Sequence, residues 1–447
     1  MKTGLLRAPT ATTLLARLID APDLVRTVRA LRESTFSALV RYIGVEDAGE
    51  IVALATLDQL VAAFDEDLFV NSKPGERETF DSARFVVWLE VLLEAGDDVA
   101  ASRFAELSQD FVVQALSSIV LVLDHDALLA RMSEGGEDAV YADKAIESSL
   151  SEELDGYLLI SRRHDGWDAA LALILALDKT HRPFLVRVLD RCADIAGAYI
   201  DDLDELSTVL SAQDSLSEDV DAEREDRRSR RGHVEPRAAR SFLALARQPL
   251  PKDVVHGERD PITRAYFRSL ENRTLPADGA ALQSPPLAGL LSTTEVRAAP
   301  LLHEITAAAG GIGHRDRAMP LVEGMRLLNE LDPSAFAERM EELAYLVNVL
   351  LAGAGTEGRR LRPADAVEAV LSTVGLGAEL EARRMAVADQ RAILRASPPE
   401  LCRVLRDCRA DLLFREASRT LASRRAVPAS IGFLRSRAEL EKVTEKL

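Results

Sequence analysis

The chain has 447 residues, of which 47% are hydrophobic and only 5% aromatic. That length predicts about two to three domains, and the hydrophobic content is too high for a disordered chain. Asp and Glu (73) outnumber Lys and Arg (55), which gives a formal net charge of −18. Surfaces that bind nucleic acids or anionic membranes need a basic excess, so the composition argues against both classes of partner. With few aromatic residues, the cores must consist mainly of Leu, Ala and Val, as is usual where helix packs on helix.

Cysteine content and the apolar runs indicate the compartment. Three cysteines, Cys192, Cys402 and Cys408, form no CxxC pair and no disulfide framework, so we expect small buried thiols. The N-terminus shows no apolar segment of signal-peptide length. The longest uncharged apolar run, Phe111–Leu123, has 13 residues, whereas a membrane span needs about 20. We expect this run to form a buried core helix, and the protein to be cytoplasmic without membrane insertion.

The first part of the chain predicts a series of amphipathic helices. Three stretches place apolar residues at the i, i+3, i+4, i+7 spacing of a helix: Phe36–Ile43, Leu57–Phe64 and Phe85–Leu92. Thr56 with Gln59 predicts a capping box, and Gly44 and Gly96 stand where helices should end. We expect helices of about 10–17 residues that pack as antiparallel hairpins.

One segment breaks this helical pattern. Tyr157–Ser161 is a β-rich run between turn residues, which predicts a strand. We therefore expect a small β-hairpin near residues 140–163, with Val140–Ala145 as the candidate partner strand. Helical periodicity resumes at about Asp168–Leu177 and again from Pro183.

Charge and proline patterns mark the middle of the chain. Residues 201–226 hold 11 acidic residues and one arginine, and residues 227–231 are strongly basic. We interpret this as a solvated helix that ends near Gly232, with charges placed as the helix dipole favours; the alternative is a docking stripe for a partner. Residues 249–300 hold seven of the 18 prolines and predict a linker or surface strap, with helical spacing only at Thr263–Leu270.

The C-terminal part is again helical. Helix starts are marked by an N-cap residue or by proline at the first helical position: Asp332 with Pro333, Pro363, Ser397 with Pro398 and Glu400, and Pro428. The predicted fold is therefore mostly α, an irregular solenoid or bundle of stacked helical hairpins with the one small β-hairpin. The predicted domains are a helical-hairpin domain, a β-hairpin and charged-helix domain, a Pro-rich linker and a C-terminal helical domain: 1–135, 136–248, 249–300 and 301–447.

Four stretches together resemble a known family: Leu31–Asp65, Asp155–Arg163 (DGYLLISRR), Arg230–Leu243 (RRGHVEPRAARSFL) and Glu342–Gly353 (ELAYLVNVLLAG). From about residue 30 to about residue 380, the chain resembles an uncharacterised bacterial domain-of-unknown-function family of mostly helical cytoplasmic proteins. The first half of that family is similar to the helical repeats in the cytosolic domain of MgtE-type magnesium transporters. The resemblance implies a helical fold, and it carries over no activity and no site residue.

Two His-Asp pairs raise the possibility of metal-dependent HD-type phosphohydrolase chemistry, which holds metal with His…His-Asp…Asp. No histidine precedes His125-Asp126. His164-Asp165 follows a predicted strand and lies among residues typical of turns, not within a helix. We expect no metal site, no cofactor and no catalytic residue, because no GxSxG, CxxC or HExxH pattern occurs either.

The segment Gly353–Gly358 has the GxxxxG spacing of a P-loop. Arg359 and Arg360 stand where Lys and Ser or Thr are needed, and a helix rather than a strand precedes the segment, so we expect a glycine-rich turn. One alternative stays open: Arg359, Arg360 and Arg362, near a helix start at Pro363, form an anion-binding site.

Two functional hypotheses follow. The first is a non-enzymatic helical scaffold or adaptor for protein–protein interaction, whose acidic surface favours a basic protein partner. The second is a small-ligand or anion-binding sensor, or an enzyme, with a site between the helical halves that uses polar residues of the 155–168 hairpin and the 353–362 loop. A deep pocket with convergent charges favours the second hypothesis, and an exposed groove favours the first.

Overall fold

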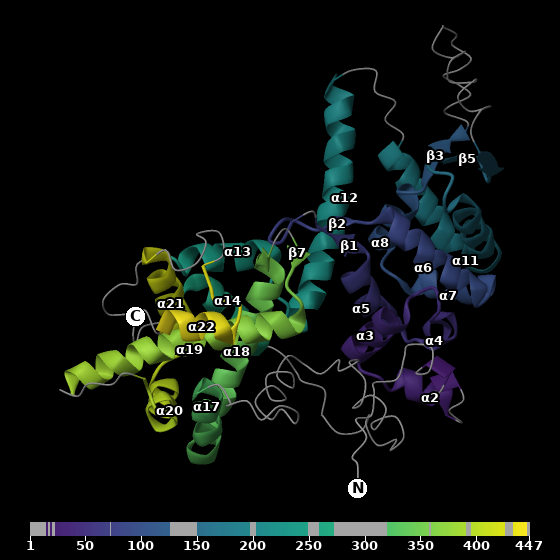
Figure 1. Ribbon diagram of the computed structural model, residues 1–447. Helices are drawn as coiled ribbons and strands as arrows, with labels where there is room; N and C mark the ends of the chain where they lie inside the picture. The colour runs from purple at the N-terminus through teal and green to yellow at the C-terminus, as the bar shows by residue number, and fades with distance from the viewer. Residues whose placement is uncertain are drawn as a thin grey trace. The chain divides into compact units, whose positions relative to one another are not determined.

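The computed structural model describes residues 15–16, 18–19, 23–71, 73–125, 150–196, 203–248, 259–271, 320–356, 359–389, 395–424 and 432–444. These residues are mostly helical (Figure 1), which confirms the predicted fold class. Regular stacking of helical hairpins stays a prediction.

Two compact units divide the chain, and each has its own hydrophobic core. The first unit takes the described residues up to 70 together with 79–225, and the second takes residues 71–78 and those from 226 onward. The border at 225 and 226 falls within one long helix, α12 (Leu203–Arg230). The four-segment division expected from the sequence stays a prediction.

Short amphipathic helices build the core of the first unit. They are α2 (Leu24–Arg29), α3 (Glu33–Ile43), α4 (Gly49–Leu54), α5 (Leu57–Asp67), α6 (Ser82–Glu94), α7 (Asp97–Glu106) and α8 (Gln109–Ser117). The predicted apolar faces are buried, and Phe36 and Trp88 are among the largest fully buried side chains. The capping box is confirmed, because Thr56 and Gln59 exchange backbone-to-side-chain hydrogen bonds at the start of α5. A two-residue strand pair, β1 (Phe69–Val70) and β2 (Thr79–Phe80), leads from α5 to α6.

The expected β-hairpin is confirmed as β4 (Ser151–Leu154) and β5 (Tyr157–Ser161), and it is part of a three-stranded antiparallel sheet. The order of the sheet is β3 (Val120–Asp124), β5, β4. β5 is the central strand, so both of its edges are occupied by described strands. Val140–Ala145, the expected partner, lies outside the described residues.

The prediction that Phe111–Leu123 forms one buried helix is wrong. The helix α8 ends at Ser117, and Ser118 follows as its C-cap, with its hydroxyl donating to the carbonyl of Ala115 at 2.6 Å. The run continues as the strand β3, in which Val120 and Val122 face the same side of the sheet. A short apolar run does not distinguish helix from strand by periodicity alone, and here the two serine residues mark the change.

Two long helices complete the first unit's described part. α11 (Trp167–Ala196) is interrupted at His181, whose backbone is non-helical, two residues before Pro183. This break matches the two helical stretches expected from the sequence. α12 confirms the predicted charged helix, which ends at a turn with Gly232 at a φ of 91°. Leu216, Val220 and Arg224 on α12 are buried, so one face of this helix packs against the unit.

The second unit is a helical bundle. Its helices are α13 (Pro236–Leu245), α14 (Pro261–Glu271), α17 (Pro320–Leu331), α18 (Pro333–Gly353), α19 (Pro363–Ala388), α20 (Pro398–Asp407), α21 (Ala410–Ser423) and α22 (Arg437–Thr444). Its core contains the aromatic contacts of Phe242 with Tyr345 and with Phe414, at centroid distances of 5.6 and 6.1 Å. The predicted N-cap at Asp332 is confirmed, since its carboxylate accepts from the backbone N–H of Ala335 at 3.0 Å.

Some predicted features lie outside the described residues. Of the predicted Pro-rich linker at 249–300, the structure describes only residues 259–271, which carry α14. The helix start expected at Pro428 is not among the described residues. Within the described ranges, no helix combines the length and the apolarity that a membrane crossing requires.

Candidate functional site

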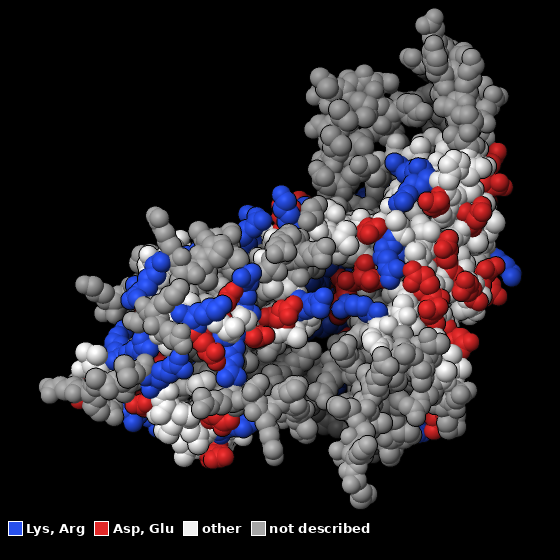
Figure 2. Space-filling model, in the orientation of Figure 1, with Lys and Arg blue, Asp and Glu red and all other residues white. Residues whose placement is uncertain are grey.

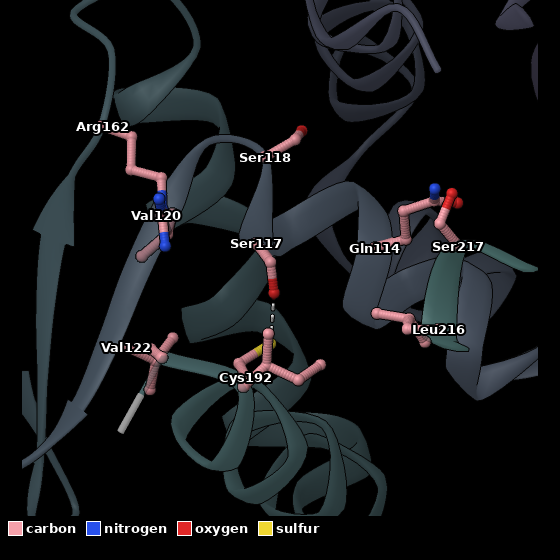
Figure 3. A pocket seen from close by; sticks show the side chains of 11 residues that line it. Gln114, Ser117, Ser118, Val120, Val122, Arg162, Cys192, Leu216 and Ser217 are labelled. Carbon is pink, nitrogen blue, oxygen red and sulfur yellow. Dashed lines mark hydrogen bonds between the residues drawn. The ribbon is translucent and has the colours of Figure 1, made fainter. Parts of the chain in front are cut away.

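The candidate site is a cavity of about 220 Å³ in the first unit (Figure 3). It lies where the three-stranded sheet meets the C-terminal parts of α8 and α11 and the middle of α12. Its lining combines one arginine, an amide, three hydroxyls, a thiol and aliphatic side chains: Arg162, Gln114, Ser117, Ser118, Ser217, Cys192, Val120, Val122, Ile195, Ala196 and Leu216. These residues come from distant parts of the chain, and tertiary packing brings them together.

Local structure explains the placement of the sheet-side residues. Alternation along β3 puts Val120 and Val122 on the face that lines the cavity. Arg162 follows β5 directly, and its backbone N–H donates to the carbonyl of Ile119 at 2.8 Å. This bond holds the start of the Arg162 side chain beside the entry to β3.

Among the described residues, Arg162 is the only charged one that lines the cavity. Its side chain is exposed, yet desolvation lowers the pKa of its guanidinium from the ordinary value. An arginine still keeps its charge at neutral pH. Among the described residues, no carboxylate forms an ion pair with Arg162. The guanidinium charge therefore faces the cavity, and no described residue supplies a counter-ion for it.

Cys192 lies at the base of the cavity and is 2% exposed. Its sulfur accepts a hydrogen bond from the Ser117 hydroxyl at 3.3 Å. Burial raises the pKa of the Cys192 thiol to about 11, and the Ser117 bond and the charge of Arg162 lower it only in part. The thiol is therefore neutral at physiological pH and is a poor nucleophile there.

Gln114 supplies an unsatisfied polar atom on α8. Its Oε1 is buried and has no hydrogen-bond partner in the structure. Buried side-chain amides normally have partners, and leaving one without a partner costs about 1–3 kcal/mol. An unsatisfied amide that lines a cavity is a position at which a ligand can complete the hydrogen bonding.

The arginine set expected from the sequence lies elsewhere, in the second unit. The backbone of Arg359 and Arg360 forms strand β7 (Arg359–Arg360), which pairs with β6 (Gly355–Thr356). Arg362 is the N-cap residue of α19, and it is exposed. The expected glycine-rich turn is thus a minimal hairpin between α18 and α19, and the anion site at these three arginines stays a prediction.

Of the two His-Asp pairs, Asp126 lies outside the described residues. His125 follows β3 directly, with Nδ1 3.3 Å from the Glu153 carboxylate, and exposed His164 lies in the bend after β5. In the part of the chain that the structure describes, no group of three or more His, Cys, Asp or Glu residues is placed to hold a metal ion.

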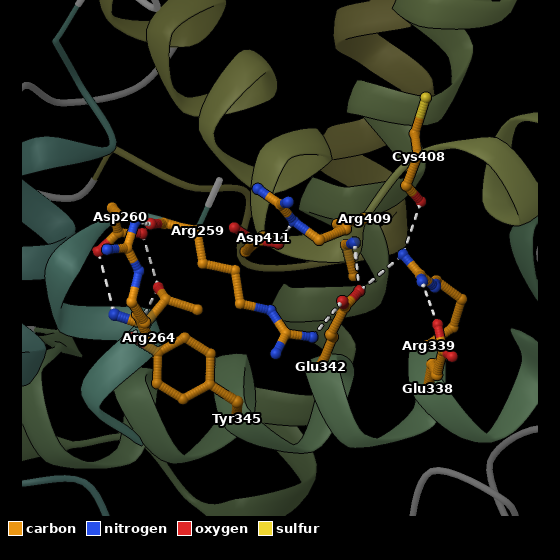
Figure 4. Close-up of polar contacts among 12 residues, drawn as sticks. Arg259, Asp260, Arg264, Glu338, Arg339, Glu342, Tyr345, Cys408, Arg409 and Asp411 are labelled. Carbon is orange, nitrogen blue, oxygen red and sulfur yellow. Dashed lines mark hydrogen bonds and ion pairs between the residues drawn. The ribbon is translucent and has the colours of Figure 1, made fainter. Parts of the chain in front are cut away.

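A second polar cluster is buried in the second unit (Figure 4). The fully buried Glu342 on α18 accepts from Arg339, from Arg259 and from the backbone N–H of Ala410, at 2.9, 3.1 and 2.8 Å. Desolvation raises the pKa of Glu342, while these donors lower it. The contacts connect α18 with the start of α21 and with Arg259, two residues before α14, so we assign this cluster a structural role.

Sequence reasoning found part of the cavity and missed the rest. It named polar residues of the 155–168 hairpin as candidates, and Arg162 is one of them. It did not single out Gln114, Ser117 or Cys192. The sequence did contain a signal. Polar residues, among them Gln114 and Ser117, interrupt the apolar run Phe111–Leu123, and a helix that only fills a core does not need them.

Comparison with known proteins gives one match. Residues 2–176 match the model of a family of unknown function (DUF6178). The expected resemblance to a domain-of-unknown-function family is thereby confirmed for this range, which contains α8, the sheet and Arg162. Similarity to MgtE-type repeats and a bacterial origin stay predictions. No curated protein and no solved structure matches the chain.

Proposed function

We propose that the protein binds a small anionic ligand in the cavity of its first unit and acts as a ligand sensor. The observation that carries this proposal is Arg162, a charged side chain that lines a cavity and forms no ion pair within the described residues. Partial desolvation strengthens the attraction of such a group for an anion, because the local dielectric is lower than that of water. The guanidinium can also donate two parallel hydrogen bonds to a carboxylate or phosphate.

The size of the cavity limits the ligand. A volume of about 220 Å³ is below the roughly 300–1,000 Å³ of sites for drug-sized molecules. The ligand is therefore compact, on the scale of a short-chain organic acid or inorganic phosphate.

The lining chemistry favours binding over catalysis. A general base or an activated nucleophile needs a pKa near the working pH. The described lining offers serine hydroxyls, an amide, an arginine and a thiol whose pKa is about 11. None of these groups is poised for proton transfer at neutral pH.

The test compares two arginine variants that remove the same charge. Arg162→Gln changes the cavity, whereas Arg191→Gln changes an exposed arginine next to Cys192 that does not line it. Isothermal titration with inorganic phosphate, acetate and butanoate should show binding to the wild-type protein and to Arg191→Gln. Arg162→Gln should weaken binding by about 10- to 100-fold, because charge-assisted hydrogen bonds contribute about 1.5–3 kcal/mol. Equal weakening by both variants, or none by either, contradicts the proposal.

A second candidate function is the adaptor for a basic protein partner, and the distribution of charge favours it. Residues 1–225 hold 44 acidic and 20 basic residues, a net charge of −24, whereas residues 226–447 have a net charge of +6. Figure 2 shows acidic side chains gathered over the first unit. On α6 and α7, Glu90, Glu94, Asp97 and Asp98 are exposed. Such a surface attracts basic partners and repels nucleic acid; we place this interaction in the bacterial cytoplasm.

Affinity purification from the host at two salt concentrations tests the adaptor. The expected result is a stoichiometric basic protein whose retention falls as salt rises, and falls further in a Glu94→Gln, Asp97→Asn, Asp98→Asn variant. A partner that is retained equally by the variant at both salt concentrations contradicts an electrostatic adaptor role.

A further inference from the structure

The polar groups of the first unit's cavity lie on opposite sides of it. In Figure 3, Arg162 lies on the side of the sheet, whereas Gln114 and Ser217 lie together on the side of α8 and α12. Ser117 and Cys192 lie between these two sides and already bond to each other. A ligand held at both sides therefore needs two separate polar groups.

The two sides require different chemistry. The Arg162 side supplies only donors and a positive charge, so it takes an anionic oxygen. On the other side, the buried Gln114 Oε1 is an acceptor without a partner. A hydroxyl group on the ligand would donate to it, and Ser217 offers a further hydroxyl nearby.

Aliphatic side chains occupy the space between the polar groups. Val120, Val122, Ile195 and Leu216 line the cavity, and Val120 and Leu216 are 1% and 4% exposed. Apolar walls favour methylene groups over a second charge, because an unpaired charge is costly to desolvate. A phosphate alone can satisfy Arg162, but it leaves the Gln114 side and these walls without contacts.

We propose that the ligand is a short aliphatic carboxylate that bears a hydroxyl group at its far end. Its carboxylate pairs with Arg162, its methylene groups lie against the valine, isoleucine and leucine side chains, and its terminal donor bonds to Gln114. This assignment rests on the proposed function, since it specifies the ligand of the same cavity.

The experiment compares ligands that differ by one terminal group. Binding of butanoate, 4-hydroxybutanoate, 4-aminobutanoate, pentanoate and 5-hydroxypentanoate is measured by titration calorimetry on the full chain. In the wild-type protein, the better-fitting terminal hydroxyl should raise affinity about tenfold over the plain acid of the same length, because it satisfies a buried acceptor. The charged ammonium of 4-aminobutanoate should not. Gln114→Met keeps the length of the side chain and removes the acceptor, so it should reduce this ratio to about one.

Two variants separate the possible failures. Gln109→Met alters the other glutamine of α8, which donates to the carbonyl of Arg187 at 3.4 Å and does not line the cavity, so the tenfold ratio should persist. Arg162→Gln should weaken the binding of all five acids.

If plain and substituted acids bind the wild-type protein equally, and Gln114→Met changes nothing, the ligand assignment is overturned while the anion site stands. If no acid and no phosphate binds the wild-type protein, both proposals fall. Thermal unfolding of each variant confirms that it is folded.

Discussion

Burial determines the chemistry of single residues in this protein. All three cysteines are buried, as the sequence analysis expects. The pKa of the Cys192 thiol and that of the Cys408 thiol are each raised to about 11, chiefly by desolvation. The number and spacing of the cysteines predicted free, buried thiols. They did not predict the contact of Cys192 with Ser117 and Arg162, because these residues lie about 75 and 30 residues from Cys192 in the sequence.

The raised pKa of Cys192 predicts a loss of stability at alkaline pH. In the unfolded chain the thiol loses its proton near pH 9, whereas in the folded chain it keeps the proton until about pH 11. Between these values the folded state binds more protons, so the free energy of unfolding falls as pH rises. Denaturant unfolding from pH 7 to 11.5 should show wild-type protein losing up to about 2–3 kcal/mol more than Cys192→Ala. Parallel curves for the two proteins would contradict this assignment, since the other titrating groups are common to both.

Helix boundaries are the features that the sequence predicts best at the scale of elements. Capping at Thr56 with Gln59 and at Asp332 with Pro333 depends on residues within one turn, so local sequence carries the information. The change from α8 to β3 was missed because the run is uncharged and mostly apolar and because the strand pairs with β5, about 40 residues away. Local sequence does not predict contacts between helices either. The close approach of α19 to α21 is an example, because it depends on a glycine, Gly377.

Gly377 permits this close approach. A Cβ at Gly377 would lie 2.0 Å from the backbone carbonyl oxygen of Leu413, so any side chain forces α19 and α21 apart. Gly377→Ala should lower the free energy of unfolding of the second unit by about 3 kcal/mol or more, as overpacking against backbone does. Gly375→Ala is the matched control on the same helix, since its Cβ would meet a Leu440 methyl at 3.5 Å and the Leu321 Cβ at 3.9 Å, both ordinary van der Waals contacts. It should be neutral or stabilising by about 0.5–1 kcal/mol through helix propensity, and a similar loss in both variants would contradict the packing argument.

At the scale of the whole molecule, the described residues form two large hydrophobic cores that share no residues, beside two small clusters. One large core extends from Leu18 to Val220, and the other from Val234 to Phe433. The mostly α class followed from composition and periodicity, and the expectation of more than one domain followed from length. The cavity did not follow, because its residues extend from Gln114 to Ser217 and no local pattern relates α8, β3, α11 and α12. Of its polar residues, the sequence pointed only to the segment that contains Arg162, and the convergence of the others is a property of the tertiary packing.

Separate cores predict separate unfolding transitions, and the tryptophans make this measurable. The chain has two tryptophans, Trp88 and Trp167, and both are buried in the first unit. Tryptophan fluorescence therefore reports the first unit alone, whereas far-ultraviolet circular dichroism reports the helices of both units. Gly377→Ala should shift part of the circular dichroism transition to lower denaturant concentration and leave the fluorescence midpoint in place. Ile51→Ala, in the first core, should lower the fluorescence midpoint, since such truncations cost about 2–5 kcal/mol. If Gly377→Ala moves the fluorescence midpoint as far as the circular dichroism midpoint, the two cores unfold as one cooperative unit.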